Sequence, residues 1–479
     1  MTTLQNLSWL GIARLGLIQT SLGAIIVLTT STLNRVMVVE MALPAMLPGF
    51  LVAVHHFVQL ARPRIGYGSD IGGRRTPWIL GGMALLAMSG VVAAFGTVLM
   101  ATSVITGSIV SFFGFFGIGL GSGATGTSLL VLLAKVVAPE RKPAAATLVW
   151  FMMIAGFAVT AGVAGHYLDP FSPSRLLTVT ATVSALAMIV TMLAIRNVEP
   201  SSYISQPTAN TEKPAFSVAL KKIWQERQAR QFTMFVFFSM FAYSFQDLIL
   251  EPYAGLVFGL SPGASTQLAG TQHAGVLLGM IAVAASGSLF SRHGVRLLRA
   301  WTVGGCIASG LVLLALASGG LNPETWHLSG NVFLLGFANG AFAVAAIATM
   351  MTLASAGQSG REGLRMGLWG AAQAIAFALG GFLGTVAVDV CQIWIDVPAH
   401  AYGLVFSFEA FMFLVAASNF FGAEFSNLGT PKMMTELLLG LDLSPYLILL
   451  MVMALIFVLG WPLEWVPIVL IVVPVLLPT

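Results

Sequence analysis

The chain of 479 residues is 57% hydrophobic and only 8% charged, whereas soluble domains are about half apolar and about a quarter charged. So few ionic side chains exclude an ordinary soluble fold and indicate a protein that lipid surrounds. The net charge of +4 does not indicate a nucleic-acid partner, because Lys and Arg lie between apolar runs and form no basic face. Cys306 and Cys391 each lie inside an apolar run and indicate neither a disulfide nor a metal site.

Apolar runs long enough to cross a bilayer recur along the chain. A spanning helix needs about 20 apolar residues, and the sequence predicts twelve such helices. They lie near residues 14–34, 42–61, 78–100, 105–134, 144–166, 175–195, 231–256, 268–290, 300–318, 330–356, 366–390 and 402–423. No small-residue cleavage site follows the first run, so we interpret it as a retained helix and not as a signal peptide.

One long polar segment divides the twelve predicted helices into six and six. The predicted regions are an N-terminal six-helix bundle, a cytoplasmic linker, a C-terminal six-helix bundle and an atypical hydrophobic tail, at residues 1–195, 196–230, 231–424 and 425–479. With a cytoplasmic N-terminus, all but three of the 22 Lys and Arg residues lie on the cytoplasmic side; the exceptions are Arg35, Arg175 and Lys432. Because positive residues stay inside, we predict a multi-pass membrane protein with a cytoplasmic N-terminus.

The two halves repeat each other in sequence. GYGSDIGGRR follows the second run and GSLFSRHGVR follows the eighth, and the two glycines that match have the same spacing in each copy. Trp150 and Gly165 match Trp369 and Gly384 at nearly the same offset along the chain. Two related six-helix halves are typical of many secondary transporters, whose site lies where the repeats meet.

The stretch RIGYGSDIGGRR concentrates charge between the second and third runs. Its residues Gly66, Asp70, Gly73, Arg74 and Arg75 resemble the loop signature of the major facilitator superfamily. Asp70 is placed to face a helix N-terminus or an arginine, Gly73 permits a tight turn, and the arginines hold the loop in the cytoplasm. The resemblance implies an all-α membrane fold of twelve transmembrane helices with a loop that gates conformational change, and it specifies no substrate.

Ionisable side chains inside the apolar runs mark candidate sites, because charge at membrane depth is costly. They lie near the outer ends of the first and seventh runs: Arg35, Glu40, Gln246, Asp247 and Glu251. Pro252 follows directly and is expected to end or kink the seventh helix. One interpretation is a polar site at the interface between the halves. The alternative is a set of interhelical salt bridges, or residues at the lipid headgroups.

Three long segments carry a narrower resemblance. TTSTLNRVMVVEMALPA, FQDLILEPYAGLVFGLSP and RPRIGYGSDIGGRRTPW resemble the PucC/LhaA family of phototrophic bacteria, a branch of the major facilitator fold, and matching segments run from about residue 10 to 424. GSDIGGRRTPWILGGM is most similar to the branch called a bacteriochlorophyll synthase chain, which is not itself the prenyl-transferring enzyme. The resemblance implies that the family-specific positions are Asn34, Arg35, Glu40, Gln246, Asp247 and Glu251.

The resemblance also implies a function and a location. The protein would deliver (bacterio)chlorophyll to light-harvesting complexes, or assist their assembly, in the intracytoplasmic photosynthetic membrane. Bacteriochlorophyll would be its cargo, with antenna polypeptides and pigment-synthesis enzymes as partners, no tightly bound cofactor and no catalytic residue. His55, His56 and His273 lie in apolar runs. They are either hydrogen-bonded packing residues or candidate axial ligands for a magnesium tetrapyrrole, with His273 also a candidate at the binding site.

Two functions of other classes stay open. A proton-coupled transporter of small molecules is expected to carry buried acids in its first, fourth or seventh helix, and the fourth run, 105–134, has none. A non-transporting scaffold would bind antenna polypeptides through its lipid-facing helices. No nucleophile triad, phosphate-cradling loop or paired hydrolytic carboxylates indicate an enzyme.

The hydrophobic tail, 425–479, does not fit a twelve-helix facilitator. Residues 445–461 predict one further helix, whereas four prolines make 462–479 a poor spanning helix. The tail thus adds one or two hydrophobic segments, and it resembles a fragment of the large membrane subunit of a TRAP transporter. We interpret it as a fusion, a frame error or a truncated neighbouring segment; the alternative is a tail helix that packs on the bundle or binds a partner.

Overall fold

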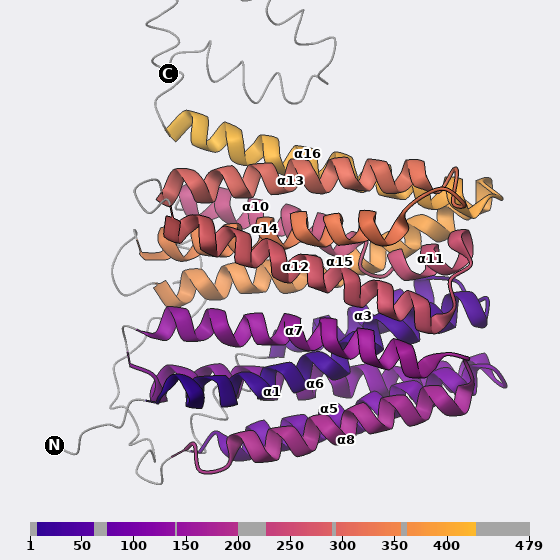
Figure 1. Cartoon of the computed structure of the whole chain (residues 1–479), viewed down its shortest axis with the longest axis horizontal. Coiled ribbons are helices and arrows are strands. Elements are labelled where there is room, and N and C mark those ends of the chain that lie inside the picture. The colour runs from indigo at the N-terminus through magenta and orange to yellow at the C-terminus, as the bar shows by residue number, and fades with distance from the viewer. Residues whose placement is uncertain are drawn as a thin grey trace, which may run out of the picture.

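Long apolar segments become helices here because, in lipid, each backbone polar group must find its partner within its own segment. The computed structural model describes residues 7–61, 74–138, 141–199, 227–289, 294–355 and 362–427, and these form a bundle of long, roughly aligned helices (Figure 1). Of the regions predicted from the sequence, most of the linker 196–230 and nearly all of the tail 425–479 lie outside the described residues.

Two sets of helices follow each other along the chain. The first set is α1 (Trp9–Val27) with its continuations η1 (Leu28–Thr32), α2 (Leu33–Arg35) and η2 (Val36–Glu40), then α3 (Met46–Val58), η3 (Gln59–Ala61), α5 (Thr76–Met100), α6 (Val104–Val136), α7 (Lys142–Leu168) and α8 (Pro173–Ile195). The second set is α10 (Arg227–Phe245), α11 (Leu250–Phe258), α12 (Pro262–Leu289), α13 (Gly294–Gly319), α14 (Leu328–Ser355), α15 (Glu362–Trp394) and α16 (Pro398–Asn427).

Each of the twelve predicted runs is helical in the described part of the chain, so the prediction of an all-α membrane protein is confirmed. Among the described residues, ten helices are long and apolar enough to cross a membrane, and α3 is a shorter apolar helix. The seventh predicted helix, 231–256, is interrupted, but before Pro252 and not at it, so the expected role of Pro252 is wrong. The chain there forms α10 and α11, with turns at Gln246–Ile249 between them.

Buried hydrophobic side chains form two large clusters. One is built from residues between Ile12 and Val198 together with Leu248, and the other from residues between Val236 and Ala417. The halves meet along two seams, where α12 packs against α7 and α15 packs against α3 (Figure 1). Glycine allows the backbones to approach closely at the first seam, since a Cβ atom on Gly165 would lie 2.6 Å from the carbonyl oxygen of Gly263.

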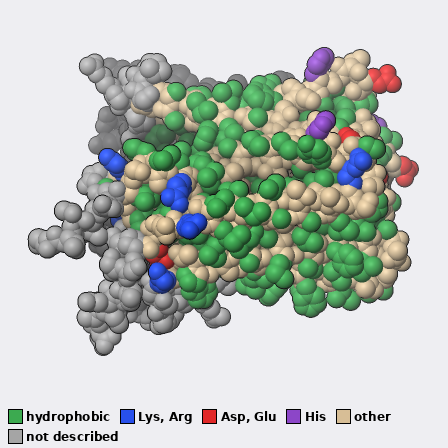
Figure 2. All heavy atoms as spheres, turned by 60° about the horizontal axis from the view of Figure 1, so that its bottom comes forward, with side chains coloured by type: hydrophobic (Ala, Val, Ile, Leu, Met, Phe, Trp, Pro, Cys, Tyr) green, Lys and Arg blue, Asp and Glu red, His purple; other side chains and the backbone are tan. Residues whose placement is uncertain are grey.

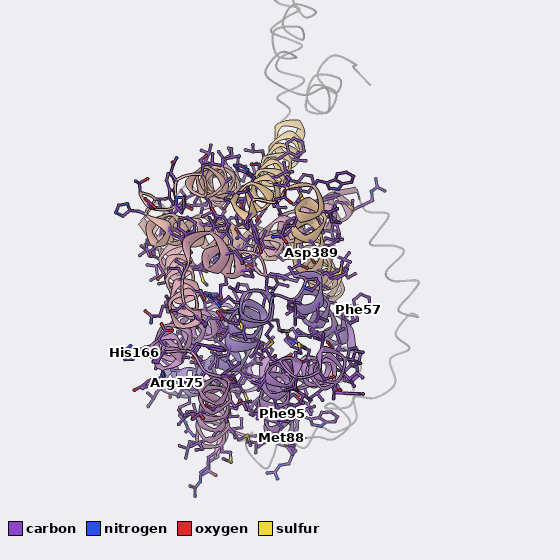
Figure 3. The ribbon with its side chains drawn as sticks, turned by 90° about the vertical axis from the view of Figure 1, so that its right-hand side faces the viewer. Phe57, Met88, Phe95, His166, Arg175 and Asp389 are labelled. Atoms are coloured by element: carbon purple, nitrogen blue, oxygen red, sulfur yellow. The ribbon has the colours of Figure 1, made fainter. Side chains whose placement is uncertain are left out.

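The bundle has two chemically different ends. We call the end that carries Trp9, Thr76 and Lys142 the near end, and the end that carries Glu40 and Leu168 the far end. Figure 2 shows the Lys and Arg side chains of that face mostly toward the near end, and the acidic and His side chains mostly toward the far end. Large apolar side chains between the two ends are exposed, as lipid-facing residues are expected to be; Phe57, Met88 and Phe95 lie at the edge of the bundle in Figure 3.

Candidate functional site

The first and seventh membrane-spanning segments, α1 to η2 and α10 to α11, are called crossings here. Both are irregular where they face each other. The first passes through π-helical turns at Leu28–Thr32 and Val36–Glu40, and the seventh breaks at Gln246–Ile249. Pro252 falls in the first turn of α11, where its missing N–H costs nothing. Irregular and discontinuous membrane helices line binding sites in many transporters, so these two segments are the natural place to search for one.

Hydrogen bonds join the halves at these irregular segments. Ser31 donates its hydroxyl proton to the Glu251 carboxylate, and the two residues are 220 positions apart, close to the offset of the sequence repeat. The Thr32 and Thr266 hydroxyls are 3.0 Å apart. The freed carbonyl of Leu248 accepts a hydrogen bond of 2.7 Å from Asn34 Nδ2. The broken helix therefore supplies both the acid and the backbone carbonyl that fasten it to the first crossing.

Arg35 links the halves nearer the far end. One guanidinium nitrogen donates to Glu40, and the other donates to the carbonyl oxygen of Leu260 in the second half at 2.5 Å. The Arg35 side chain is only 2% exposed, whereas that of Glu40 is 35% exposed. Within the described chain, these two residues thus form an ion pair that closes the far end, and they do not line the cavity described next.

A cavity of about 410 Å³ lies between the halves. Its walls come from α1 and η1, α3, α6 and α7 of the first half and from α10, α11, α12, α14 and α15 of the second. Aromatic walls are provided by Trp150, Phe157, Tyr243 and Phe377. The volume falls in the range of pockets that hold drug-sized organic ligands, and no Lys or Arg is among the described residues that line it.

The cavity gathers five of the ionisable candidates: His55, His56, Asp247, Glu251 and His273 all line it. Asp247 lies in the break between α10 and α11, and its side chain is exposed to this space. Glu251, by contrast, is buried and bonded to Ser31. Gln246 points elsewhere; it is fully buried and does not line the cavity. The structure therefore divides the sequence-predicted site into cavity residues and residues that fasten the far end.

The histidines sit beside phenylalanines at the two seams. The His273 ring on α12 meets Phe157 on α7 edge-on, with 5.0 Å between ring centroids. The His56 ring on α3 stacks on Phe377 of α15 at 5.7 Å. Phe157 and Phe377 are separated along the chain by the same offset as Ser31 and Glu251, so the internal repeat places one His–Phe pair on either side of the cavity.

Two aspartates that seal the far end follow the same repeat. Asp389 on α15 accepts from the backbone N–H groups of Ala45 and Met46 at the start of α3, at 2.9 and 2.7 Å. Asp169, directly after α7, accepts from the Ser261 hydroxyl at 2.7 Å and from Gly263 N–H at 3.2 Å at the start of α12. Each acid thus caps a helix of the other half. Figure 3, which looks onto the far end, shows Asp389 inside the bundle outline and His166 at its edge.

Sequence reasoning did not single out Asp169, although its position carried a signal: it ends a long apolar run and precedes Asp389 by the offset of the repeat. It also missed Glu199 at the near end. The Glu199 carboxylate accepts from the N–H groups of Arg75 and Thr76 at 2.7 and 2.9 Å and from the Thr76 hydroxyl at 2.7 Å. Partial burial works to raise the pKa of Glu199, but the hydrogen bonds from Arg75 and Thr76 outweigh it and lower that pKa.

Only part of the predicted gating loop is described. Arg74 is exposed and Arg75 is buried at the start of α5, while Gly66, Asp70 and Gly73 lie outside the described residues. Glu199 caps the N-terminus of α5 at this end, and the partner of Asp70, a helix N-terminus or an arginine, stays a prediction. The gating role itself stays a prediction.

One protein family and several proteins of phototrophic bacteria are similar to this chain over most of its length. The family model described as PUCC protein matches residues 32–421. The Rhodobacter capsulatus protein named "Bacteriochlorophyll synthase 44.5 kDa chain" is 50% identical over 86% of this chain and 95% of its own length. A protein named PucC from Rhodobacter capsulatus is 29% identical over 84% of this chain and 90% of its own.

Solved structures show the fold. A D-xylose–proton symporter superposes with a TM-score of 0.66 and 16% identity, covering 85% of this chain and 96% of that one. A bacterial homologue of the lysosomal transporter Spinster, in an inward-facing and occupied conformation, gives 0.65 and 13%, covering 86% and 96%. These are major facilitator transporters, so the predicted major facilitator fold is confirmed; at such identities the likeness says nothing about substrate.

Proposed function

The chain belongs to the PUCC family, and on that premise we propose that it holds (bacterio)chlorophyll in its central cavity and delivers it to light-harvesting complexes or assists their assembly. The cavity lining carries the proposal: apolar and aromatic walls interspersed with hydroxyl, amide, imidazole and carboxyl groups, and no Lys or Arg among the described lining residues. A flat magnesium tetrapyrrole needs such walls, with polar contacts only for its carbonyls and its metal. The relative that is 50% identical has bacteriochlorophyll in its name.

The location and partners belong to the same proposal. The protein would lie in the intracytoplasmic photosynthetic membrane with its N-terminus in the cytoplasm, because the basic side chains of the near end follow the positive-inside rule. Those described there include Arg14, Arg74, Arg141, Lys142 and Arg196. Antenna polypeptides would receive the pigment and pigment-synthesis enzymes would supply it.

We propose a carrier and not an enzyme, although the name of the relative mentions a synthase. The fold is that of transporters. Glu251 at the cavity bonds Ser31, and Asp389 and Asp169 at the far end cap helices. Pigment would be cargo that enters and leaves, so no tightly bound cofactor is proposed.

One observation favours a second candidate, proton-coupled transport of a small solute. Asp247 exposes a carboxyl group to the cavity at the break of the seventh crossing, with Glu251 one turn further on. Membrane-embedded acids of this kind relay protons in many transporters. The same residues also suit contacts with a metal-bearing cargo, so an experiment has to separate the two candidates.

That experiment is deletion of the gene in a phototroph, followed by whole-cell absorption spectra and complementation. A matched pair of variants tests the cavity. Gly126 lines it, and a Cβ there would meet only Leu22, at 3.9 Å; Gly304 is exposed on α13 and a Cβ there would meet nothing within 4 Å. Gly126→Phe therefore fills the cavity, whereas Gly304→Phe adds the same ring to the outer surface.

We expect the deletion strain to lose near-infrared antenna absorption, Gly304→Phe to restore it, and Gly126→Phe to fail while reaching the membrane in equal amount. Normal antenna with altered uptake of a solute would favour the transporter. Full restoration by Gly126→Phe would show that the cavity is not needed, which would favour a scaffold that binds antenna polypeptides through its outer surface.

A further inference from the structure

The three cavity histidines differ in what their ring nitrogens contact. His273 Nδ1 lies 2.8 Å from the carbonyl oxygen of Ala269, one turn earlier on α12. A carbonyl oxygen only accepts, so Nδ1 carries the proton and Nε2 keeps a free lone pair. His55 Nε2, by contrast, lies 3.0 Å from Gln59 Nε2, and the His56 ring lies between His55 and Phe377.

The hydrogen bond of His273 is the one that metal-binding histidines make. Such residues usually donate the proton of one ring nitrogen to a carboxylate or a backbone carbonyl, which fixes the tautomer and the ring orientation and leaves the other nitrogen for the metal. Phe157 supports the His273 ring edge-on at 5.0 Å. The imidazole is thus held in one tautomer in the wall of the cavity.

The surroundings of His273 indicate which kind of metal it suits. No group of three or more His, Cys, Asp or Glu side chains that would hold a metal ion occurs among the described residues. Within the described chain, a bare cation would therefore lack a set of three such protein ligands. A metal that arrives with its other positions already filled needs only one, and a metal tetrapyrrole is such a group, because its ring supplies four nitrogens in a plane.

We propose that His273 Nε2 is the axial ligand for the central magnesium of a tetrapyrrole cargo. This inference rests on the proposed function and names the atom that recognises the pigment. The imidazole lone pair forms a coordinate bond to magnesium and displaces a solvent ligand, and no proton moves. Ala269 acts as a positioning residue through its carbonyl oxygen, and Phe157 packs against the edge of the ring.

The test compares two pigments that differ only in the metal. Purified full-length protein in detergent is titrated with bacteriochlorophyll a and with bacteriopheophytin a, which has two protons in place of magnesium. The wild type is expected to bind the magnesium pigment about tenfold more tightly or better. His273→Phe keeps an aromatic ring of similar size and removes the ligand, so the two pigments are expected to bind it equally. His166→Phe, on the exposed edge of α7, is the matched control and should keep the preference.

The outcomes separate this inference from the function on which it rests. If the wild type binds neither pigment, the proposed pigment carrier is wrong. If it binds both and the preference for magnesium survives in His273→Phe, or disappears only in His55→Phe or His56→Phe, then the assignment of His273 alone is overturned. Should His273→Phe not fold, His273→Gln replaces it, and the Qx absorption band, which responds to axial ligation, is compared with that of the wild type.

Discussion

Arg35 and Glu40 are partners with unequal burial, and this inequality has consequences for stability. Replacing Glu40 leaves a guanidinium that is 2% exposed with the Leu260 carbonyl as its remaining partner, and an unpaired buried charge is costly. Replacing Arg35 leaves a carboxylate that is 35% exposed and that water or headgroups reach.

We therefore expect Glu40→Gln to destabilise the protein by about 3 kcal/mol and Arg35→Leu by only about 1–2 kcal/mol. Thermal unfolding of both variants in one detergent measures the order of the two losses. A larger loss in Arg35→Leu would mean that the contact of Arg35 with Leu260, and not its pairing with Glu40, dominates.

Glu199 at the near end makes the stability of the folded protein depend on pH. Its carboxylate caps α5, and its pKa is lowered below the ordinary value of 4.5. A lowered pKa in the folded state means that the stabilisation is fully present above pH 4.5 and is lost as the pH falls through the folded value. We expect Glu199→Gln to lower the free energy of unfolding by about 1 kcal/mol at neutral pH. The loss is expected to shrink progressively as the pH falls below 4.5.

Unfolding midpoints of wild type and Glu199→Gln, measured at several pH values from neutral into the acidic range, check this prediction. Glu324 is an exposed acid in the turns between α13 and α14, and Glu324→Gln supplies the comparison. If the difference in unfolding midpoint between wild type and Glu199→Gln stays constant throughout the acidic range, the carboxylate charge contributes nothing to the cap.

At the scale of elements, the two far-end aspartates form a matched pair of latches between the halves. Asp169 and Asp389 each accept two hydrogen bonds at the start of a helix that belongs to the other half. An amide at either position keeps one acceptor oxygen but turns two N–H donors toward the donors of the partner helix. Each Asn substitution is expected to weaken closure of the far end by about 1 kcal/mol.

The latches belong to separate seams and share no partner, so their effects are expected to add. The double variant Asp169→Asn with Asp389→Asn would then raise the ratio of open to closed molecules roughly thirtyfold. Spin labels at Thr102 and Asn322, exposed at the far end of the two halves, report the separation. Asp396→Asn alters an exposed acid at the same end and should leave the distances unchanged; unchanged distances in the double variant would exclude a latch.

The helices could be predicted from the sequence, but their irregularities could not. Hydropathy decides which segments lie in lipid, so α5, α6 and α7 were found within a few residues of their bounds. It does not register the break at Gln246–Ile249, because Gln246 and Asp247 could equally face a polar site from an unbroken helix, and because the freed carbonyl of Leu248 is satisfied by Asn34 on another helix. A tertiary hydrogen bond decides the local structure there.

The candidate site was recognised by residue type and not by arrangement. Buried charge identified Arg35, Glu40, Asp247 and Glu251, yet only the last two line the cavity. The offset of the internal repeat relates Ser31 to Glu251, Phe157 to Phe377 and Asp169 to Asp389. Of these pairs, Ser31 and Glu251 bond to each other, whereas the others make matching contacts with different partners. Which residues meet depends on the packing of the two halves, and single-chain composition carries no record of it.

For the molecule as a whole, the internal repeat is what creates a site. Two halves with separate hydrophobic clusters touch along the seams α7–α12 and α3–α15, and the cavity lies between the seams. At the far end, the halves are joined by Ser31, Asn34, Arg35 and the two aspartates, so the described structure is closed there. Exchange of the proposed pigment cargo would therefore require either opening at the near end or a lateral opening between the seams.

Segment 428–479 allows a last prediction about the whole chain. The family match ends at residue 421, and within the described residues the hydrophobic cluster of the second half extends to Ala417. The described residues that line the cavity all precede residue 382. A chain that stops after Asn427 therefore keeps the whole cavity lining and both latches, and we expect it to restore antenna absorption in the deletion strain to the level given by the full chain. Membrane abundance of both chains is measured alongside by immunoblot. If the shortened chain reaches the membrane in equal amount but leaves antenna absorption low, the hydrophobic tail contributes a contact that pigment delivery needs.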